Sequence, residues 1–462
     1  MAITTEEKST CNDNKQLIEL LPPDLVKLSK LSVKLENPLA GLSISELETE
    51  AMVFCAQNGL NEEVENFKRG AVLAGDPRNL DRITNISADE RMYIEWEKIN
   101  RWKQPMIMYY IAIISSMAAI VQGMDEAVVN GAQLFYYDRF GIRSDGTKKT
   151  ALIQGLVNSA PYLCCAFFAC WLTDPLNRWL GRRGVIFLSC AIAGLASIWE
   201  AFTYSWQQLF VSRLVLGLGI GPKLEEETQQ GRNLIADMWR VARIRRAAVA
   251  SGLLMFMQQF CGVNVIAYYS SQVFTEAGFT NKQALLTTMG TGLVNWVFAI
   301  PALYTIDTFG RRNLLLVTFP IMAFCLLLTG MAFFIPFTGE GDTRRAGLVA
   351  SGIYLYMVFY SPGAGPVPFT YSAEAFPLFI RDFAMSYATA VAWLFNFILA
   401  ITFPLLLDVF TPQGAFGWYA GWCIIGWVLV FFLMPETKAL TLEELDNAIR
   451  LRKTLVLCEI LI

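Results

Sequence analysis

Ten long apolar segments run through most of this chain and constrain it more than any other feature. They lie at 105–122, 151–172, 184–204, 206–221, 247–274, 285–306, 313–335, 348–371, 383–409 and 416–433. A helix needs about 20 apolar residues to cross a hydrocarbon core of roughly 30 Å. Backbone groups cannot stay unpaired in lipid, and these segments lack the alternation of barrel strands, so each is predicted to be a helix. The expected fold class is an all-α membrane protein with about ten transmembrane helices.

Composition separates a polar tail from this membrane body. Of the 462 residues, 54% are hydrophobic and 17% are charged, whereas soluble domains carry about 25% charged residues. The chain contains no histidine, which removes the commonest metal ligand and the usual proton shuttle. We therefore expect no metal site, no cofactor, no nucleic-acid partner and no enzymatic activity, and we expect any proton chemistry to rest on carboxylates.

The polar tail, 1–104, is predicted to form cytosolic helices. Ser43 precedes Glu46 by three residues, the spacing of a capping box, and Gly59 is a good helix stop. A second helix is predicted from Ser87. Its apolar stripe rests either on the membrane interface or on the protein's own cytosolic face, and the sequence leaves both open; the stripe consists of Tyr93, Trp96, Ile99 and Trp102.

Arginine-rich turns predict the orientation of the spans. The stretches NRWLGRRG, RVARIRRAA and FGRRN all fall on one side if the tail is inside the cell. The loop FTGEGDTRRAG falls on the opposite side and is a mild exception. Both termini are therefore expected in the cytosol.

Two of these turns repeat an acid followed by Gly-Arg-Arg. TDPLNRWLGRRG and IDTFGRRN each join two spans, and the arginines of such a turn can pair with acids on a neighbouring helix. We predict a cytosolic latch; the alternative is simple anchoring by positive charge. The candidate latch residues are Asp174, Arg182, Arg183, Asp307, Arg311, Arg312, and also Glu374 and Arg381 of TYSAEAFPLFIRD.

The repeat also reveals an imbalance between the two halves. Four spans precede the stretch LGLGIGPKLEEETQQGRN and six follow it. Because transporters are often built from two similar halves, two spans are predicted to be missing at Lys223/Leu224. The predicted organisation is a tail (1–104), an incomplete first half (105–223), a linker remnant (224–246), a complete second half (247–434) and a cytosolic tail (435–462).

Several motifs together resemble the sugar porter family of the major facilitator superfamily, and its fungal members in particular. PETKALTLEELD is similar to the family's C-terminal signature, QQFCGVNVIAYYS to its seventh helix and GPVPFTYSAEAFP to its tenth. The resemblance covers the chain from Pro105 onward and implies a helical bundle of twelve helices. Relative to it, this chain has about ten (4+6) and lacks the end of helix four, helices five and six, and the start of the central intracellular domain.

The resemblance implies a proton-coupling pair. Asp125 lies in the outer half of the first span and Arg213 in the fourth, and charges inside spans are costly. In proton-coupled members the matching acid takes up the proton and pairs with the matching arginine. A static ion pair is the alternative.

The resemblance also implies a sugar site made of amides and aromatic rings. Amides both donate and accept hydrogen bonds, which suits hydroxyls, although polar residues in spans also serve as interhelical hydrogen bonds. Phe369 stands where many sugar porters have Trp, and Ser361 where several hexose carriers have Glu. The implied sugar-binding residues are Gln258, Gln259, Asn264, Asn295, Phe369, Trp393 and Asn396.

These features predict a plasma-membrane sugar or polyol transporter that works by alternating access, with proton symport, and that is impaired by the loss of two helices. Its expected partners are a small sugar or polyol, the proton and the lipid bilayer. Two alternatives remain open at this point. One is a sugar sensor or binding protein that does not transport, and the other is an inactive splice or gene-model product.

Overall fold

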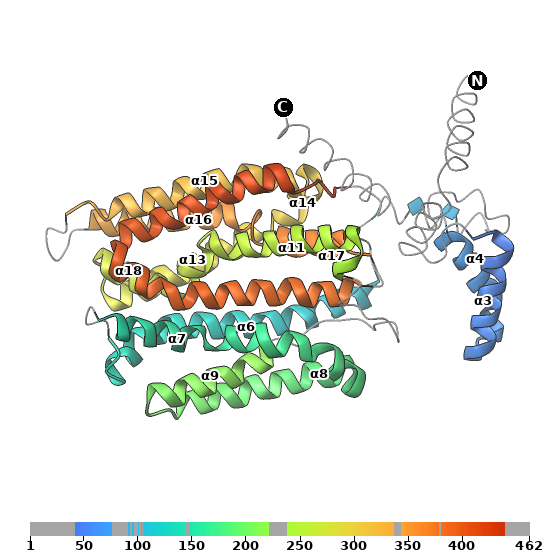
Figure 1. Cartoon of the computed structure of the whole chain (residues 1–462), viewed down its shortest axis with the longest axis horizontal. Coiled ribbons are helices and arrows are strands. Elements are labelled where there is room, and N and C mark those ends of the chain that lie inside the picture. The colour runs from blue at the N-terminus through green and yellow to red at the C-terminus, as the bar shows by residue number, and fades with distance from the viewer. Residues whose placement is uncertain are drawn as a thin grey trace, which may run out of the picture. The chain divides into compact units, whose positions relative to one another are not determined.

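A computed structural model describes residues 42–75, 91–92, 95–96, 100, 103, 105–143, 147–220, 238–336, 343–377 and 380–438. Within these residues, all regular secondary structure is helical (Figure 1). The all-α fold class is therefore confirmed. The junction at Lys223/Leu224 lies outside the described residues.

A helical hairpin forms the described segment 42–75, which precedes the first span. It comprises α3 (Ile44–Asn58), a 3-10 turn (Asn61–Glu63) and α4 (Val64–Gly75). The predicted capping box is present, since the Ser43 hydroxyl accepts from the Glu46 amide and the Glu46 carboxylate accepts from the Ser43 amide at 2.8 Å. Gly59 ends α3 with φ 70°. The helix predicted from Ser87 falls mostly outside the described residues.

The first membrane half contains four long helical stretches, of which the second passes through a π-helical turn into the third. They are α6 (Met106–Arg139), α7 (Lys148–Cys164) with η3 (Cys165–Ala169), α8 (Cys170–Ala201) and α9 (Trp206–Ile220). α8 is interrupted at Gly181, whose φ of 68° breaks the helix within the first Gly-Arg-Arg turn. Two apolar segments are thereby joined end to end without a long loop.

The described part of the second half, with the residues just before it, contains eight further helices. They are α11 (Ala242–Phe260), α12 (Val263–Ala277), α13 (Asn281–Ala299), α14 (Ala302–Phe309), α15 (Arg311–Ala332), α16 (Thr343–Tyr360), α17 (Val367–Ala375) and α18 (Arg381–Leu433). α11 and α12 are one span broken at Gly262, where φ is 97°. α18 is broken at Thr411, directly before Pro412, so it holds two of the predicted spans.

Each of the ten predicted apolar segments lies largely in helix, but their number as spans is not established. Within the described residues, five helical runs are long and apolar enough to cross a membrane, or six if the bent pair α13 and α14 is one span. The difference arises because α18 combines two segments, because α9 has only 15 residues, and because α6 and α16 are not among these runs. The count of ten remains a prediction.

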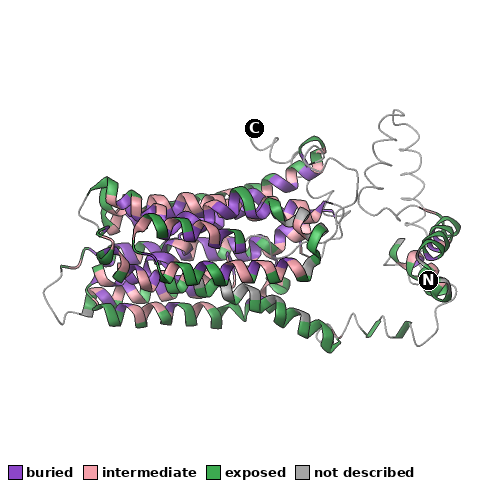
Figure 2. Cartoon of the chain, turned by 90° about the horizontal axis from the view of Figure 1, so that it is seen from below, coloured by how far each residue is buried: buried purple, intermediate pink, exposed green. Residues whose placement is uncertain are grey.

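The main buried core belongs to the second half. It gathers side chains from α11, α12, α15, α16 and α18, and Tyr162 of α7 joins it from the first half. Figure 2 shows buried residues along the inside of the bundle and exposed ones on its outer faces. Apolar side chains such as Phe187 and Leu195 of α8 are more than two thirds exposed, as suits a surface that faces lipid.

Glycine lets α7 of the first half approach α18 of the second. A Cβ atom at Gly155 would lie 2.8 Å from the Ile401 Cα atom. Small residues at such crossings let backbones touch, which is the main source of helix association in membranes.

We expect Gly155→Ala to lower the apparent melting temperature of the full chain in detergent, because overpacking costs about 1–3 kcal/mol. Gly194→Ala is the matched control: it lies on exposed α8, where an added Cβ meets nothing within 4 Å. There the change should raise stability slightly, since Ala is the better helix former. Equal shifts in both variants would contradict the close crossing of α7 and α18.

Candidate substrate and gating sites

Amides from the break between α11 and α12 form one side of the candidate substrate site. Gln258 and Gln259, at 5% and 7% exposed, end α11. Gln258 Nε2 donates to the Gly365 carbonyl at 2.7 Å, in the turn between α16 and α17. Asn264 Nδ2, in the first turn of α12, donates to Gln259 Oε1. The break at Gly262 therefore brings together three of the predicted sugar residues.

Asn396 and Trp393 of α18 supply another side. Asn396 is 2% exposed, and its Nδ2 donates to the Tyr268 hydroxyl at 2.7 Å. Within the described part of the chain, its buried Oδ1 has no hydrogen-bond partner. A buried acceptor without a partner is costly, so this oxygen is well suited to receive a hydroxyl from a ligand.

Three aromatic rings are stacked between the two halves, and sequence reasoning missed two of them. The Tyr162 ring of α7 lies parallel to Trp393, with centroids 5.4 Å apart and an interplanar angle of 1°. The Tyr162 ring also stacks on Tyr268 of α12, with centroids 5.1 Å apart and an interplanar angle of 19°. Trp393 thus already has one face covered by the opposite half, and the only signal in the sequence was a tyrosine within an apolar run.

The other two implied sugar residues, Asn295 and Phe369, lie on α13 and α17. Asn295 of α13 accepts a 2.5 Å hydrogen bond from the Ser361 hydroxyl, directly after α16. The two positions are therefore coupled in this chain. Phe369 of α17 is 41% exposed, so the expectation that it lies in an enclosed pocket with the amides has no support in its burial.

Arg213 is buried deep in the first half. The residue is 1% exposed, and its Nη2 approaches the Asn158 carbonyl of α7 at 3.5 Å. Asp125 lies on α6, but its side chain is outside the described residues, so the pairing with Arg213 remains a prediction.

A second group of polar residues, also missed from the sequence, joins the two halves directly. Asn130 of α6 donates to the Ala267 carbonyl at 2.6 Å and to the Ser270 hydroxyl at 2.8 Å. Gln133 donates to the Tyr268 carbonyl at 2.8 Å. We call these contacts between α6 and α12 the polar seam. The sequence signal was two amides three residues apart in VVNGAQ, on one face of a span.

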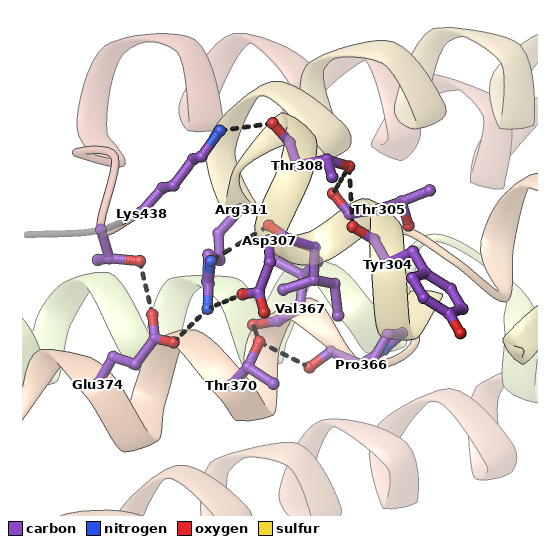
Figure 3. A network of polar contacts seen from close by, with 12 residues as sticks. Tyr304, Thr305, Asp307, Thr308, Arg311, Pro366, Val367, Thr370, Glu374 and Lys438 are labelled. Atoms are coloured by element: carbon purple, nitrogen blue, oxygen red, sulfur yellow. Dashed lines mark hydrogen bonds and ion pairs between the residues drawn. The ribbon is translucent and has the colours of Figure 1, made fainter. Parts of the chain in front are cut away.

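The second-half latch is an ionic network (Figure 3). Arg311 Nη2 lies 3.1 Å from the Asp307 carboxylate and 2.6 Å from that of Glu374 on α17. The other oxygen of Glu374 accepts from the Thr437 hydroxyl at 2.8 Å. The structure therefore brings these three predicted latch residues together.

Glu436 is the latch residue that the sequence did not reveal. Its carboxylate accepts from the backbone amides of Arg311 at 2.9 Å and Arg312 at 3.1 Å, at the N-terminus of α15. Helix N-termini favour negative charge. Gly310 has φ 88°, and a Cβ there would lie 2.6 Å from Glu436 Oε2, so only glycine fits. The sequence signal for Glu436 was its place in the Pro-Glu-Thr stretch that begins the C-terminal signature.

Within the described structure, the side chains of Arg312 and Arg381 meet backbone carbonyls rather than acids. Arg312 donates to the Phe431 carbonyl at 2.9 Å, and Arg381 to the Phe376 carbonyl at 3.4 Å. Arg183 is exposed, while the side chains of Asp174 and Arg182 are outside the described residues. The two Gly-Arg-Arg turns nevertheless share one backbone shape: Gly181 has φ 68° and ψ 165°, and Gly310 has φ 88° and ψ 160°.

Comparison with known proteins agrees with this geometry. A family model described as "Sugar (and other) transporter" matches residues 111–224 and 222–449. The crystal structure of a D-xylose-proton symporter superposes with a TM-score of 0.59, at 19% identity, and the match covers 72% of this chain and 99% of that chain. At that identity the likeness shows the fold alone.

Two curated relatives are similar in sequence. Myo-inositol transporter 1 of Cryptococcus neoformans is 39% identical over 209 residues, which cover 43% of this chain and 36% of that protein. Myo-inositol transporter 2 of Schizosaccharomyces pombe is 32% identical over 213 residues, which cover 46% of this chain and 38% of that protein. The chain thus spans less than half of the length of these relatives.

We expect Glu436→Gln to lower the apparent melting temperature of the full chain, because the charge that receives two amides at the start of α15 is lost. Hydrogen bonds to charged groups are worth about 1.5–3 kcal/mol each. Asp138→Asn is the matched control: Asp138 is an exposed acid that pairs with Arg143 at 3.1 Å, and such pairs contribute about 0–1 kcal/mol. Similar shifts in both variants would contradict a structural role for Glu436.

Proposed function

Because the chain belongs to the sugar (and other) transporter family of the major facilitator superfamily, we propose that this integral, multi-pass membrane protein binds a sugar or cyclic polyol between its halves and moves it by alternating access. The observation that carries the proposal is the group of amides and rings at the centre of the bundle. Gln258, Gln259 and Asn264 offer both donors and acceptors, and Asn396 offers a buried acceptor.

The chemistry of that centre suits a neutral ring that carries hydroxyls. Amide groups can donate to one hydroxyl and accept from the next. The Trp393 ring offers an apolar face for the C–H face of a sugar, as aromatic rings do when they pack flat. Relatives named as transporters of myo-inositol, trehalose and xylose have substrates of this kind.

Binding requires the halves to rearrange. Tyr162 covers one face of Trp393, and the Tyr268 hydroxyl already accepts a hydrogen bond from the Asn396 amide. We infer that a substrate either uses the other face of Trp393 or replaces Tyr162 when the first half moves away. The polar seam between α6 and α12 would then open. On the cytosolic side, the network around Arg311 and Glu374 would act as the second gate.

Proton coupling through Asp125 is part of the proposal. Arg213 is 1% exposed, and charges inside spans are costly and mark functional sites. Asp125, on the first span, is the acid that the resemblance pairs with it. Protonation of Asp125 would release Arg213 and allow the first half to move. A solved structure with the same fold is named as a proton symporter.

The proposal also includes a loss of two helices at Lys223/Leu224. The family model matches in two stretches that meet at 222–224, where the symmetry of the halves predicts the break. A chain without these helices would be impaired in uphill transport. We further propose a plasma-membrane location with both termini in the cytosol, and the domain boundaries given above.

Sugar binding without transport is the second candidate function. The main buried core and all seven of the predicted sugar residues belong to the second half, which retains its six predicted spans. An inactive product would lack binding altogether, so a binding measurement separates these alternatives.

We expect the purified full chain to bind tritiated myo-inositol, D-xylose or trehalose saturably. Asn396→Ala and Trp393→Ala should each weaken that binding by roughly 10-fold or more, since each removes a contact worth about 1–3 kcal/mol. Trp296→Ala is the matched control, because Trp296 of α13 is 68% exposed. Uptake in carrier-deficient cells should be weaker for this chain than for a version with the two helices restored. Absence of saturable binding would contradict the proposal.

We expect Asp125→Asn, made in the version with restored helices, to abolish proton-driven accumulation of labelled substrate while exchange across the membrane continues. The neutral amide cannot take up the proton that couples the cycle. Asp138→Asn, at the exposed end of the same helix, is the control and should accumulate substrate normally. Undiminished accumulation by the Asp125 variant would exclude this residue as the proton acceptor.

A further inference from the structure

One face of α6 carries a row of polar residues that the expected mechanism does not fully use. Glu126, Asn130, Gln133 and Tyr137 follow one another at spacings of four, three and four, which places them along one face of a helix. The last three are buried, at 1%, 0% and 7% exposed. Asn130 and Gln133 reach α12 through the polar seam. Glu126, which is partly exposed, therefore faces the second half as well.

Glu126 lies one helical turn before Asn130, on the face of α6 that meets α12. α12 carries Asn264 in its first turn and Tyr268 one turn later, so the same stretch of α12 borders both the polar seam and the candidate substrate site.

Two tyrosines connect this region to residues that the resemblance assigns to the sugar. The Tyr268 hydroxyl accepts from Asn396. Tyr162, which stacks on Tyr268, also stacks on Trp393. Glu126 thus provides the first half with an acidic group on the face that meets this part of the second half.

An ionised carboxylate complements amides in a way that selects for neighbouring hydroxyls. It has two oxygens that only accept, so it can take hydrogen bonds from both hydroxyls of a vicinal pair. Such charge-assisted bonds are roughly twice as strong as neutral ones. The same charge repels an anionic ligand. A site with Glu126 on one side therefore fits neutral polyols and excludes sugar acids and sugar phosphates.

We propose that Glu126 is a substrate-binding residue whose carboxylate accepts hydrogen bonds from two vicinal hydroxyls of a neutral ring polyol. The inference rests on the proposed sugar-binding function and names the part of the substrate that the first half recognises. It assigns Glu126 a role separate from proton uptake at Asp125, the adjacent position, which lies about 100° further around the helix axis.

The test is a double-mutant cycle in which the Glu126 side chain is changed in the protein and one hydroxyl is removed from the substrate. Equilibrium binding to the full chain in nanodiscs is measured for tritiated myo-inositol and D-glucose, and then for each monodeoxy derivative of whichever parent binds. In the unmodified chain, removal of either hydroxyl of the vicinal pair should raise Kd by roughly 10- to 100-fold. Glu126→Gln should raise Kd for the parent by a similar factor. In the Glu126→Gln variant, removal of the same hydroxyls should raise Kd little further, because the group that accepts their hydrogen bonds has already been weakened.

A control variant and a control ligand make the outcome decisive. Asp138→Asn, on the same helix, should leave every Kd unchanged. If Glu126→Gln lost affinity equally for all derivatives, or lost none, the residue would have no direct contact with the hydroxyls and the inference would be overturned. The unmodified chain should also bind D-glucuronate at least ~10-fold more weakly than D-glucose, and equal affinity would overturn the inference even if the Gln variant failed to fold. Absence of saturable binding of both parents would overturn the proposed function and this inference together.

Discussion

Hydrogen bonds from α6 to α12 are the contact on which the arrangement of the two halves depends. In lipid, helices gain little from the hydrophobic effect, so polar contacts and close packing decide how they associate. Asn130 and Gln133 are both almost fully buried, and they satisfy backbone carbonyls of α12 directly. If these amides separated from α12 without water to replace it, buried polar groups would be left unpaired, which is costly. The seam therefore favours either full closure or full, hydrated opening.

The latch at the start of α15 is built on a different principle. Glu436 receives backbone amides that a helix end leaves unsatisfied, while the Arg311 side chain pairs with Asp307 and Glu374. These charges are partly exposed, so water can replace the ion pairs at modest cost. The seam is made of neutral amides and the latch of charges, and the candidate substrate site lies among residues connected to the seam. A carrier needs two such closures that do not open together, and the two differ enough in chemistry to respond to different signals.

Local patterns predicted much of the fold. Ten apolar segments fall on helices, the capping box at Ser43 is present, and the span that contains the sugar amides breaks at Gly262. The missed features all depend on partners distant in sequence. In the sequence, Tyr162 is one more residue of an apolar segment, and only the structure shows the parallel Trp393 ring beside it. Glu436 is part of the C-terminal signature, and only the structure shows its hydrogen bond to the start of α15. The sequence drew attention to Asp125 and not to its neighbour Glu126. Only the helical register with Asn130, whose contacts are seen in the structure, shows that Glu126 faces the second half.

The central claim is that the two halves meet at a closable substrate site. It is tested most directly by a distance between spin labels on unnatural, ketone-bearing residues at positions 139 and 282, the exposed end of α6 and start of α13. The distance distribution of the full chain in nanodiscs would be measured without ligand and with a saturating neutral polyol. Our account predicts two separate distances whose populations shift when the polyol is added. A single distance that does not change with ligand would contradict it.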